Sequence, residues 1–457
     1  MMKLFLQWLL VVCLLAALLD AACGAEPQKD RCVILVSVDG LAGFYLDDPV
    51  AHMPTLRRMA VEGARAAGMV CSFPTVTWPN HTTLVTGVEP ARHGVLGNNY
   101  LDRSTARNIP LIVDPLFDKD EIVKVPTIYD VAHAAGLTTA AIVWPATRNA
   151  RTLHFTVPDM KGNESWARYG TTSWLAELRE AGVPVDRHGT WVEQSGGGVQ
   201  RDWLYVRMAA HLLQKHAPNL LLIHLVEVDH VQHREGPRSA DAYWSVSYAD
   251  SCLRDLVDAV ARSPRAARTT IIVTSDHGFF PIDVEIRPQV LMRKLGLRGG
   301  PQPAAASVSQ GGACAVYILD QARRKQIADQ LAELFQATRG IQAVLKPAEF
   351  SRIGQPTPDQ DPRAPDLWLS AESGFSFSDA EAGEDVLVPR ASRAGTHGYL
   401  PDQPDMLGTL VLWGHGIRSG VNLGKVKSVD VAPTIAALLG LEMPDVQGRV
   451  LHEALAP

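Results

Sequence analysis

The residues of this chain best suited to chemistry are three aspartates and three histidines at expected strand ends or beside glycines. They are Asp39, Asp229, His233, Asp276, His277 and His397. Asp229 and His233 are four residues apart, which is one turn if that segment is helical. Six oxygen and nitrogen ligands divide into two sets of three, each with an open coordination position, as a catalytic binuclear zinc site requires. The sequence therefore predicts a site for two Zn²⁺ ions.

A second candidate is residues 73–87, where Thr75 and Thr77 precede Pro79. Proline is tolerated in the first turn of a helix, so we expect a helix that begins here and ends at Gly87. The N–H groups at a helix N-terminus favour a phosphate group. A threonine hydroxyl is a poor nucleophile until a metal ion lowers its pKa, and two cations can then stabilise displacement at phosphorus. The stretch therefore predicts a nucleophile that faces the metal site.

Apolar runs at 32–38, 220–226 and 270–275 are typical of strands buried on both faces of a sheet. Further strands are expected at 138–144 and 407–413, and helices at 53–66, 126–136, 240–262 and 431–439. This alternation predicts a doubly wound, mostly parallel α/β sheet with helices on both faces. Ligands gather at the carboxyl ends of such strands, where Asp39, Asp229 and Asp276 follow.

The composition is that of a globular protein, with 46% hydrophobic and 20% charged residues and a formal net charge of −6. The acidic balance argues against a nucleic-acid polymer as partner and allows a small anionic substrate if metal ions supply positive charge. Residues 147–200 and 280–395 fit the strand–helix pattern poorly. We expect one catalytic domain over 26–457, with these two segments as loops and a small cap.

Residues 1–25 resemble a secretory signal, with an apolar stretch after Lys3 and small residues before a cleavage position after Ala25. A periplasmic or secreted protein is expected. An uncleaved membrane anchor and a lipid on Cys23 are the alternatives. Four further cysteines, Cys32, Cys71, Cys252 and Cys314, are spaced too widely for a zinc site, and the sequence leaves disulfides and buried thiols equally open.

Several segments together resemble the nucleotide pyrophosphatase/phosphodiesterase family, in its bacterial form, of the alkaline phosphatase superfamily. The matching segments are 38–40, 73–81, 275–278, 395–398 and 428–434, together with Asn98, Asp229 and His233. The match spans nearly the whole chain after residue 31. The resemblance implies an alkaline phosphatase-like core, two zinc ions, and hydrolysis of phosphodiester or phosphoanhydride bonds in a small substrate such as a nucleotide.

The resemblance also implies individual roles. Thr77, rather than Thr75, matches the nucleophile that forms a phospho-threonine intermediate, because it directly precedes the aromatic-Pro-Asn-His run. One zinc, in contact with Thr77, would be held by Asp39, Asp276 and His277, and the other by Asp229, His233 and His397. Substrate would be bound by Asn98, through a non-bridging phosphate oxygen, and by Trp78 and Trp144 near the pocket. Trp78 replaces the usual phenylalanine, which leaves substrate choice open.

Rival functions remain. A phosphonoacetate hydrolase-like enzyme uses a related two-zinc threonine site, and a choline-phosphoester phosphodiesterase could enclose a quaternary ammonium with aromatic rings. A phosphomonoesterase is less favoured because no basic residue lies near Thr77 in the sequence. A sulfatase would need Cys or Ser at that position, and a non-catalytic binding protein would be expected to lack Thr77 or Asp276. The oligomeric state is not indicated.

Overall fold

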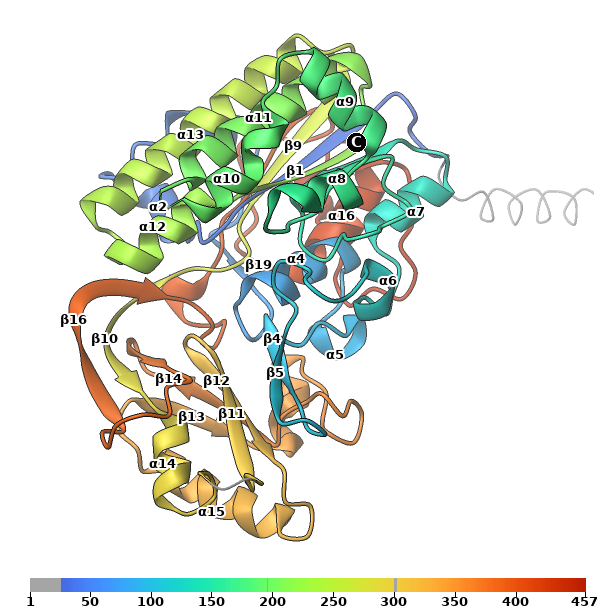
Figure 1. Ribbon diagram of the computed structural model, residues 1–457. Coiled ribbons are helices and arrows are strands. Elements are labelled where there is room, and N and C mark those ends of the chain that lie inside the picture. The colour runs from blue at the N-terminus through green and yellow to red at the C-terminus, as the bar shows by residue number, and fades with distance from the viewer. Residues whose placement is uncertain (1–25, 195, 300–301) are drawn as a thin grey trace, which may run out of the picture.

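The computed structural model describes residues 26–194, 196–299 and 302–457, so the expected signal segment 1–25 lies outside it. Its main sheet has eight strands in the order β18-β2-β17-β9-β1-β8-β6-β7 (Figure 1). These strands are β18 (Val421–Asn422), β2 (Ala64–Arg65), β17 (Leu410–Gly414), β9 (Thr269–Thr274), β1 (Cys32–Val38), β8 (Leu220–Leu225), β6 (Thr139–Ile142) and β7 (Phe155–Val157). The strands expected from apolar runs are confirmed, and all lie in this sheet.

The centre of the sheet is parallel. β1 pairs in parallel with β8 on one side and β9 on the other, with Val33 opposite both Leu220 and Thr270. Every residue of these three strands is buried, which explains their continuous apolar sequences. β17 is antiparallel to β9, so the sheet is mostly rather than wholly parallel. The carboxyl ends of β1, β8 and β9 therefore lie together at one edge.

Helices cover both faces of this sheet, as the sequence predicts. Ile34 and Val36 of β1 belong to a hydrophobic cluster with one set of helices, and Val33 and Leu35 to a cluster with the other. The first set is α3 (Pro54–Glu62), α11 (Gly198–Lys215) and α13 (Ala240–Ala261), and the second is α4 (Thr77–Thr86), α7 (Ile128–Ala134) and α16 (Val431–Leu438). The alternation of side chains along β1 thus forms two cores.

Residues 280–395, where loops and a small cap were expected, contain extensive regular structure. A three-stranded sheet, β15-β10-β16, consists of β10 (Phe280–Ile286), β15 (Gly374–Phe377) and β16 (Leu387–Thr396). A four-stranded antiparallel sheet contains β11 (Ala305–Gln310), β12 (Ala313–Ile318), β13 (Ile341–Leu345) and β14 (Leu367–Ala371). With α14 (Pro288–Lys294) and α15 (Arg324–Gln336) these sheets form a second body below the main sheet in Figure 1. We call residues 280–395 the cap.

Residues 147–200 lie beside the main sheet rather than in the cap. This segment adds the edge strand β7 and three short helices, α8 (Asn163–Tyr169), α9 (Thr172–Glu180) and α10 (His188–Glu193). Trp166 and Trp174 are buried in the same cluster as α11 and α13. These two tryptophans therefore belong to the core of the molecule.

The four cysteines after residue 25 are free and buried. Of the two alternatives left by the sequence, the structure shows buried thiols. Among the helices of the described residues, none is both long and apolar enough to cross a membrane.

Candidate active site

The helix predicted at residues 77–87 is α4, and its N-terminus faces a cavity. Val76, in extended conformation, precedes it, and Gly87, with φ of 68°, ends it. The N–H of Trp78, which lacks a helical acceptor, donates to Oδ1 of Asn98 at 2.9 Å. Because the amide oxygen of Asn98 is occupied in this way, its NH₂ group is the end that can donate to a ligand. Thr77 and Asn98 both line the cavity.

The two threonines of this stretch have different surroundings. The Thr75 hydroxyl is fully buried, donates to the carbonyl of Tyr399 at 3.0 Å and accepts from the N–H of Gly398 at 3.0 Å. The Thr77 side chain lines the cavity instead. Thr75 therefore joins the loop before α4 to the chain after His397, and Thr77 is the threonine that reaches the cavity.

Loops and helix starts bring the six predicted ligands together in the two expected sets. Asp39, Asp276 and His277 place one ligand atom each within 4.8 Å of the others, and so do Asp229, His233 and His397. Asp39 follows β1, Asp276 and His277 follow β9, and Asp229 and His233 lie on α12 (Glu227–Glu235) after β8. His397 follows β16 of the cap.

All three histidines of these sets present the same nitrogen to the centre. Nδ1 faces a backbone carbonyl in each: Gly278 for His277 at 3.0 Å, Gly395 for His233 at 3.1 Å and Thr75 for His397 at 2.9 Å. A carbonyl can only accept, so Nδ1 carries the hydrogen and Nε2 has a lone pair. This arrangement orients imidazoles that bind metals.

The nitrogen and oxygen atoms that point to the centre of each set carry lone pairs that face one another. Nε2 of His277 lies 3.3 Å from Oδ1 of Asp39 and 3.2 Å from Oδ2 of Asp276. All three of these atoms are buried without a hydrogen-bond partner. In the other set, Nε2 of His397 and Nε2 of His233 are 3.2 Å apart. Converging lone pairs repel one another unless a cation or protons lie between them, so these residues fit two metal ions.

The two carboxyl groups of the Asp39, Asp276 and His277 set have shifted pKa values, as expected for carboxylates buried close together. Burial and the neighbouring Asp39 carboxylate raise the pKa of Asp276 to about 8. Burial opposes ionisation of Asp39 too, but the adjacent rings of His224 and His277 hold its pKa below the usual value. Two carboxylates this close do not both ionise readily without a positive charge between them.

A further layer of histidines, which the sequence did not reveal as functional, supports this set. Nε2 of His224 lies 3.1 Å from Oδ2 of Asp39, and its Nδ1 is 3.9 Å from Oδ2 of Asp159. The His81 ring packs 4.2 Å from the His224 ring, and its Nδ1 donates to the carbonyl of Thr77 at 2.9 Å. The signal for His224 was a single polar residue within the apolar run 220–226.

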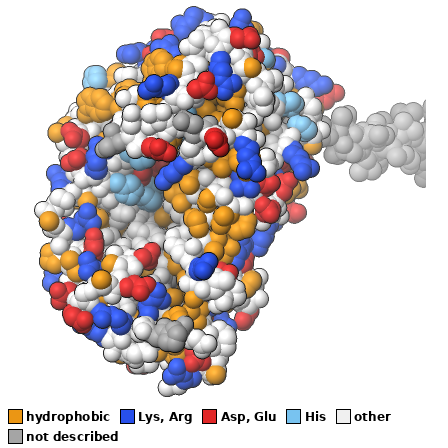
Figure 2. All heavy atoms as spheres, in the orientation of Figure 1, with side chains coloured by type: hydrophobic (Ala, Val, Ile, Leu, Met, Phe, Trp, Pro, Cys, Tyr) orange, Lys and Arg blue, Asp and Glu red, His pale blue; other side chains and the backbone are white. Residues whose placement is uncertain are grey.

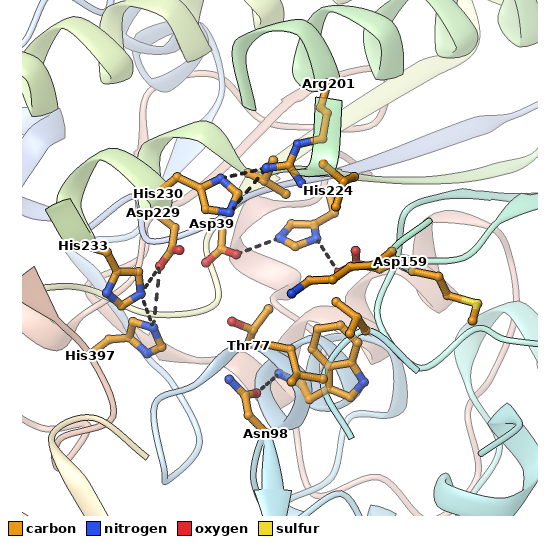
Figure 3. A pocket seen from close by; sticks show the side chains of 17 residues that line it. Asp39, Thr77, Asn98, Asp159, Arg201, His224, Asp229, His230, His233 and His397 are labelled. Atoms are coloured by element: carbon orange, nitrogen blue, oxygen red, sulfur yellow. Dashed lines mark hydrogen bonds and ion pairs between the residues drawn. The ribbon is translucent and has the colours of Figure 1, made fainter. Parts of the chain in front are cut away.

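The cavity itself measures about 340 Å³. Histidines gather around a hollow on the face shown in Figure 2, and Figure 3 shows Thr77 between the His233–His397 pair and Asp159. Four of the six predicted ligands and Asn98 line it, together with residues such as Trp78, Asp159, Lys161, Arg201 and His230. The sequence did not indicate a role for Asp159, Lys161 or Arg201, which come from segments without a recognised motif.

The two predicted tryptophans are placed differently. Trp78 lines the cavity, but only 1% of it is exposed, and its Nε1 donates to Oδ1 of Asp114 at 3.1 Å. Trp144 is fully buried with its ring edge against His81, and the cavity wall formed by described residues does not include it. The structure therefore does not bring Trp144 to the cavity.

The family model for type I phosphodiesterase / nucleotide pyrophosphatase matches residues 33–400. An uncharacterized pyrophosphatase/phosphodiesterase of Schizosaccharomyces pombe is 28% identical over 54% of this chain and 45% of its own length. Ectonucleotide pyrophosphatase/phosphodiesterase family member 3 of Mus musculus is 26% identical over 56% of this chain and 26% of its own length. The match thus covers less than half of either relative.

Longer matches agree. Ectonucleotide pyrophosphatase/phosphodiesterase family member 7 of Homo sapiens is 23% identical over 93% of this chain and 84% of its own length. Among solved structures, an inactive variant of murine ectonucleotide pyrophosphatase/phosphodiesterase 5 in complex with AMP has a TM-score of 0.69, 20% identity, and coverage of 93% of this chain and 100% of that one. At this identity the structure shows a shared fold. The model match over most of the chain shows more: this protein belongs to the type I phosphodiesterase / nucleotide pyrophosphatase family.

Proposed function

We propose that this chain is a two-zinc phosphodiesterase that hydrolyses phosphodiester or phosphoanhydride bonds in small substrates, nucleotides among them. The observation that carries the proposal is the position of Thr77. It lies at the N-terminus of α4 and lines a cavity together with ligands of both sets. Family membership and the AMP complex of the murine neighbour support a substrate of this class.

In the proposed reaction, the Thr77 oxygen attacks phosphorus in line with the departing oxygen. The bond between Thr77 Oγ1 and phosphorus forms as the ester or anhydride bond breaks, and the departing group leaves with the electron pair and takes a proton from water. Asp39, Asp276 and His277 would hold one zinc and Asp229, His233 and His397 the other. When bound, the ions would lower the pKa of the threonine hydroxyl and stabilise the entering and departing oxygens.

The remaining groups position the substrate. The NH₂ group of Asn98 would donate to a non-bridging oxygen, while the α4 N-terminus favours its negative charge. Water then displaces Thr77 from phosphorus, which releases a phosphate monoester and restores the hydroxyl. A choline ester is not favoured, because the cavity offers lysine and arginine rather than a set of exposed aromatic faces.

The test is a substrate panel on zinc-loaded protein without its first 25 residues. Bis(4-nitrophenyl) phosphate, 4-nitrophenyl phosphate, ATP and phosphonoacetate would be compared by kcat/KM. We expect the diester and ATP to react faster than the monoester and phosphonoacetate. Faster turnover of the monoester than of the diester would overturn the proposal. So would release of phosphate from phosphonoacetate without turnover of the diester or ATP.

We also propose that residues 1–25 direct export and are removed after Ala25. N-terminal sequencing of the mature protein from its native host should then begin at Glu26. A lipid-modified N-terminus at Cys23 would replace this proposal with the lipoprotein alternative.

A further inference from the structure

One side of the cavity carries positive charge that the proposed reaction at Thr77 does not use. Lys161 follows β7, and Arg201 is in the first turns of α11; both line the cavity. Asp159 and Met160 complete this side. We call these four residues the cationic side of the cavity.

Among the described residues, neither cation is in contact with a carboxylate, although Asp159 lies near enough to attract both. The Arg201 guanidinium lies 3.0 Å from Nδ1 of His230, and its Nε is buried without a hydrogen-bond partner. In the part of the chain that the structure describes, neither Lys161 nor Arg201 forms an ion pair with a carboxylate, while most other arginines around the molecule do. The Asp159 carboxylate lies beside His224, at 3.9 Å. Unpaired cations that line a cavity are suited to an anion.

The position of this side indicates which part of a substrate it would contact. In Figure 3, Asp159 lies on the opposite side of Thr77 from His233 and His397. Because the family resemblance assigns the zinc of Asp39, Asp276 and His277 to Thr77, we place the departing oxygen of an in-line attack near the Asp229, His233 and His397 set. The cationic side therefore faces the substituent that stays on phosphorus.

The other walls near this side restrict that substituent. Ile112, Val113, Met160 and Val192 provide aliphatic contacts, and the Trp78 ring is almost wholly buried. A short chain that ends in an anion fits these walls and the two cations better than a planar base, which needs an exposed aromatic face.

We propose that Lys161 and Arg201 form an anion subsite that selects phosphodiesters whose retained substituent carries a carboxylate or a phosphate. The inference rests on the proposed phosphodiesterase function and adds a substrate preference to it. Lys161 is exposed and can reach toward a ligand, whereas Arg201 is held by His230. Both residues determine specificity and leave the bond-making step to Thr77.

Two matched substrates test this subsite: 4-nitrophenyl 2-carboxyethyl phosphate and 4-nitrophenyl 2-carbamoylethyl phosphate. They share the leaving group and differ in one charge on the retained substituent. We expect the zinc-loaded protein to prefer the carboxylate about tenfold or more in kcat/KM, the range of a charge-assisted contact. Lys161→Ala should bring the ratio close to one, Lys161→Glu should reverse it, and Arg201→Lys should retain more of it than Arg201→Ala.

Arg207→Ala is the matched control, because Arg207 is also on α11 but lies 3.7 Å from Asp255, outside the cavity. It removes the same charge, and its ratio should equal that of the unaltered protein. An equal ratio in Lys161→Ala and the unaltered protein, or no preference in the unaltered protein, would overturn the subsite while the diesterase function stands. No turnover of either substrate by the unaltered protein would overturn the function itself.

Discussion

The inward Nε2 atoms of His233, His277 and His397 are fixed by backbone rather than by side chains. Their Nδ1 hydrogens point to carbonyl groups of Gly395, Gly278 and Thr75. A carbonyl has no second protonation state, so it holds one tautomer over a wide pH range. The geometry of the nitrogen ligands therefore depends on loop conformation, and each ring can be tested separately by its own substitution.

His233→Ala should lower the zinc content from two ions to one per chain, because the Asp229 and His397 ligands alone leave the set with two members. His230→Ala is the control on the same helix, since His230 contacts Arg201 and belongs to neither ligand set. Metal content measured by mass spectrometry after extensive dialysis would decide. Two retained ions in His233→Ala would rule out its role as a ligand.

Thr77→Ala and Thr75→Ala should separate chemistry from stability. Loss of the Thr77 hydroxyl should reduce kcat by about a thousandfold or more, with zinc content and Tm unchanged, because it removes the attacking atom. Loss of the Thr75 hydroxyl leaves the N–H of Gly398 without its acceptor, which should cost about 1–3 kcal/mol of unfolding free energy. Kinetics and thermal unfolding of both variants provide the comparison, and substantial activity in Thr77→Ala would place the nucleophile elsewhere.

At the scale of elements, side-chain hydrogen bonds hold α12 at its start and along its length. The buried Asp202 carboxylate accepts the N–H groups of Val226 at 2.8 Å and Glu227 at 3.1 Å, where the helix begins. Farther along, the Gln232 amide donates to the carbonyl of Gly40 at 2.9 Å and accepts from the Tyr45 hydroxyl at 2.9 Å. Gln232 thus joins the helix that carries one ligand set to the loop that follows Asp39 of the other.

The turn after His397 should be equally sensitive. Gly398 has φ of +101°, and a Cβ there would lie 1.9 Å from the carbonyl oxygen of Gln310. Gly398→Ala should move His397 and reduce zinc content and activity together. Gly136→Ala is the control, because Gly136 also has positive φ but no atom within 4 Å of its Cβ position. Equal losses of zinc in the two variants would mean that backbone strain alone, and not the collision, is responsible.

These elements show how far sequence reasoning extends. The rule that ligands follow parallel strands placed Asp39, Asp229 and Asp276 together, and the helix that would bring Asp229 and His233 onto one face is present as α12. The same rule could not place His224, because its ring reaches Asp39 from within a strand, nor Arg201, which lies near the start of α11 and not after a strand. It also could not show that Trp144 turns its ring toward His81, since such orientation depends on packing between distant segments.

In the whole molecule, the central strands of the main sheet were predictable, and a small cap was expected, but the strands and helices within the cap were not. The central strands of the main sheet are buried on both faces and form long apolar runs, whereas β10 mixes buried with partly exposed residues and most of β16 is not buried. β11, β12 and β14 are well buried, but small and polar residues interrupt their apolar character. The local pattern of residues 280–395 therefore suggested loops and a small cap without regular elements of its own, although the segment has its own hydrophobic cluster.

The stability of the whole molecule should not depend on disulfides, because all four cysteines after residue 25 are free and buried. Burial raises the pKa of the Cys32 thiol to about 12, so it is protonated and unreactive near neutral pH. A reductant should leave Tm unchanged in the protein without residues 1–25. Thiol titration in denaturant should find four thiols per chain; two or none would show disulfides that the structure lacks.

The position of the cap within the sequence has a consequence for how the chain is made. β17 lies between β9 and β2 in the main sheet, and both it and His397 come after the whole cap. Because the ribosome makes the chain from the N-terminus onward, Asp39, Asp276 and His277 are present well before His397 is added. Until then, β9 has an open edge, which in a sheet invites pairing with other chains. A growing chain kept unfolded until its last sixty or so residues are present would avoid both this pairing and the early capture of a single metal ion.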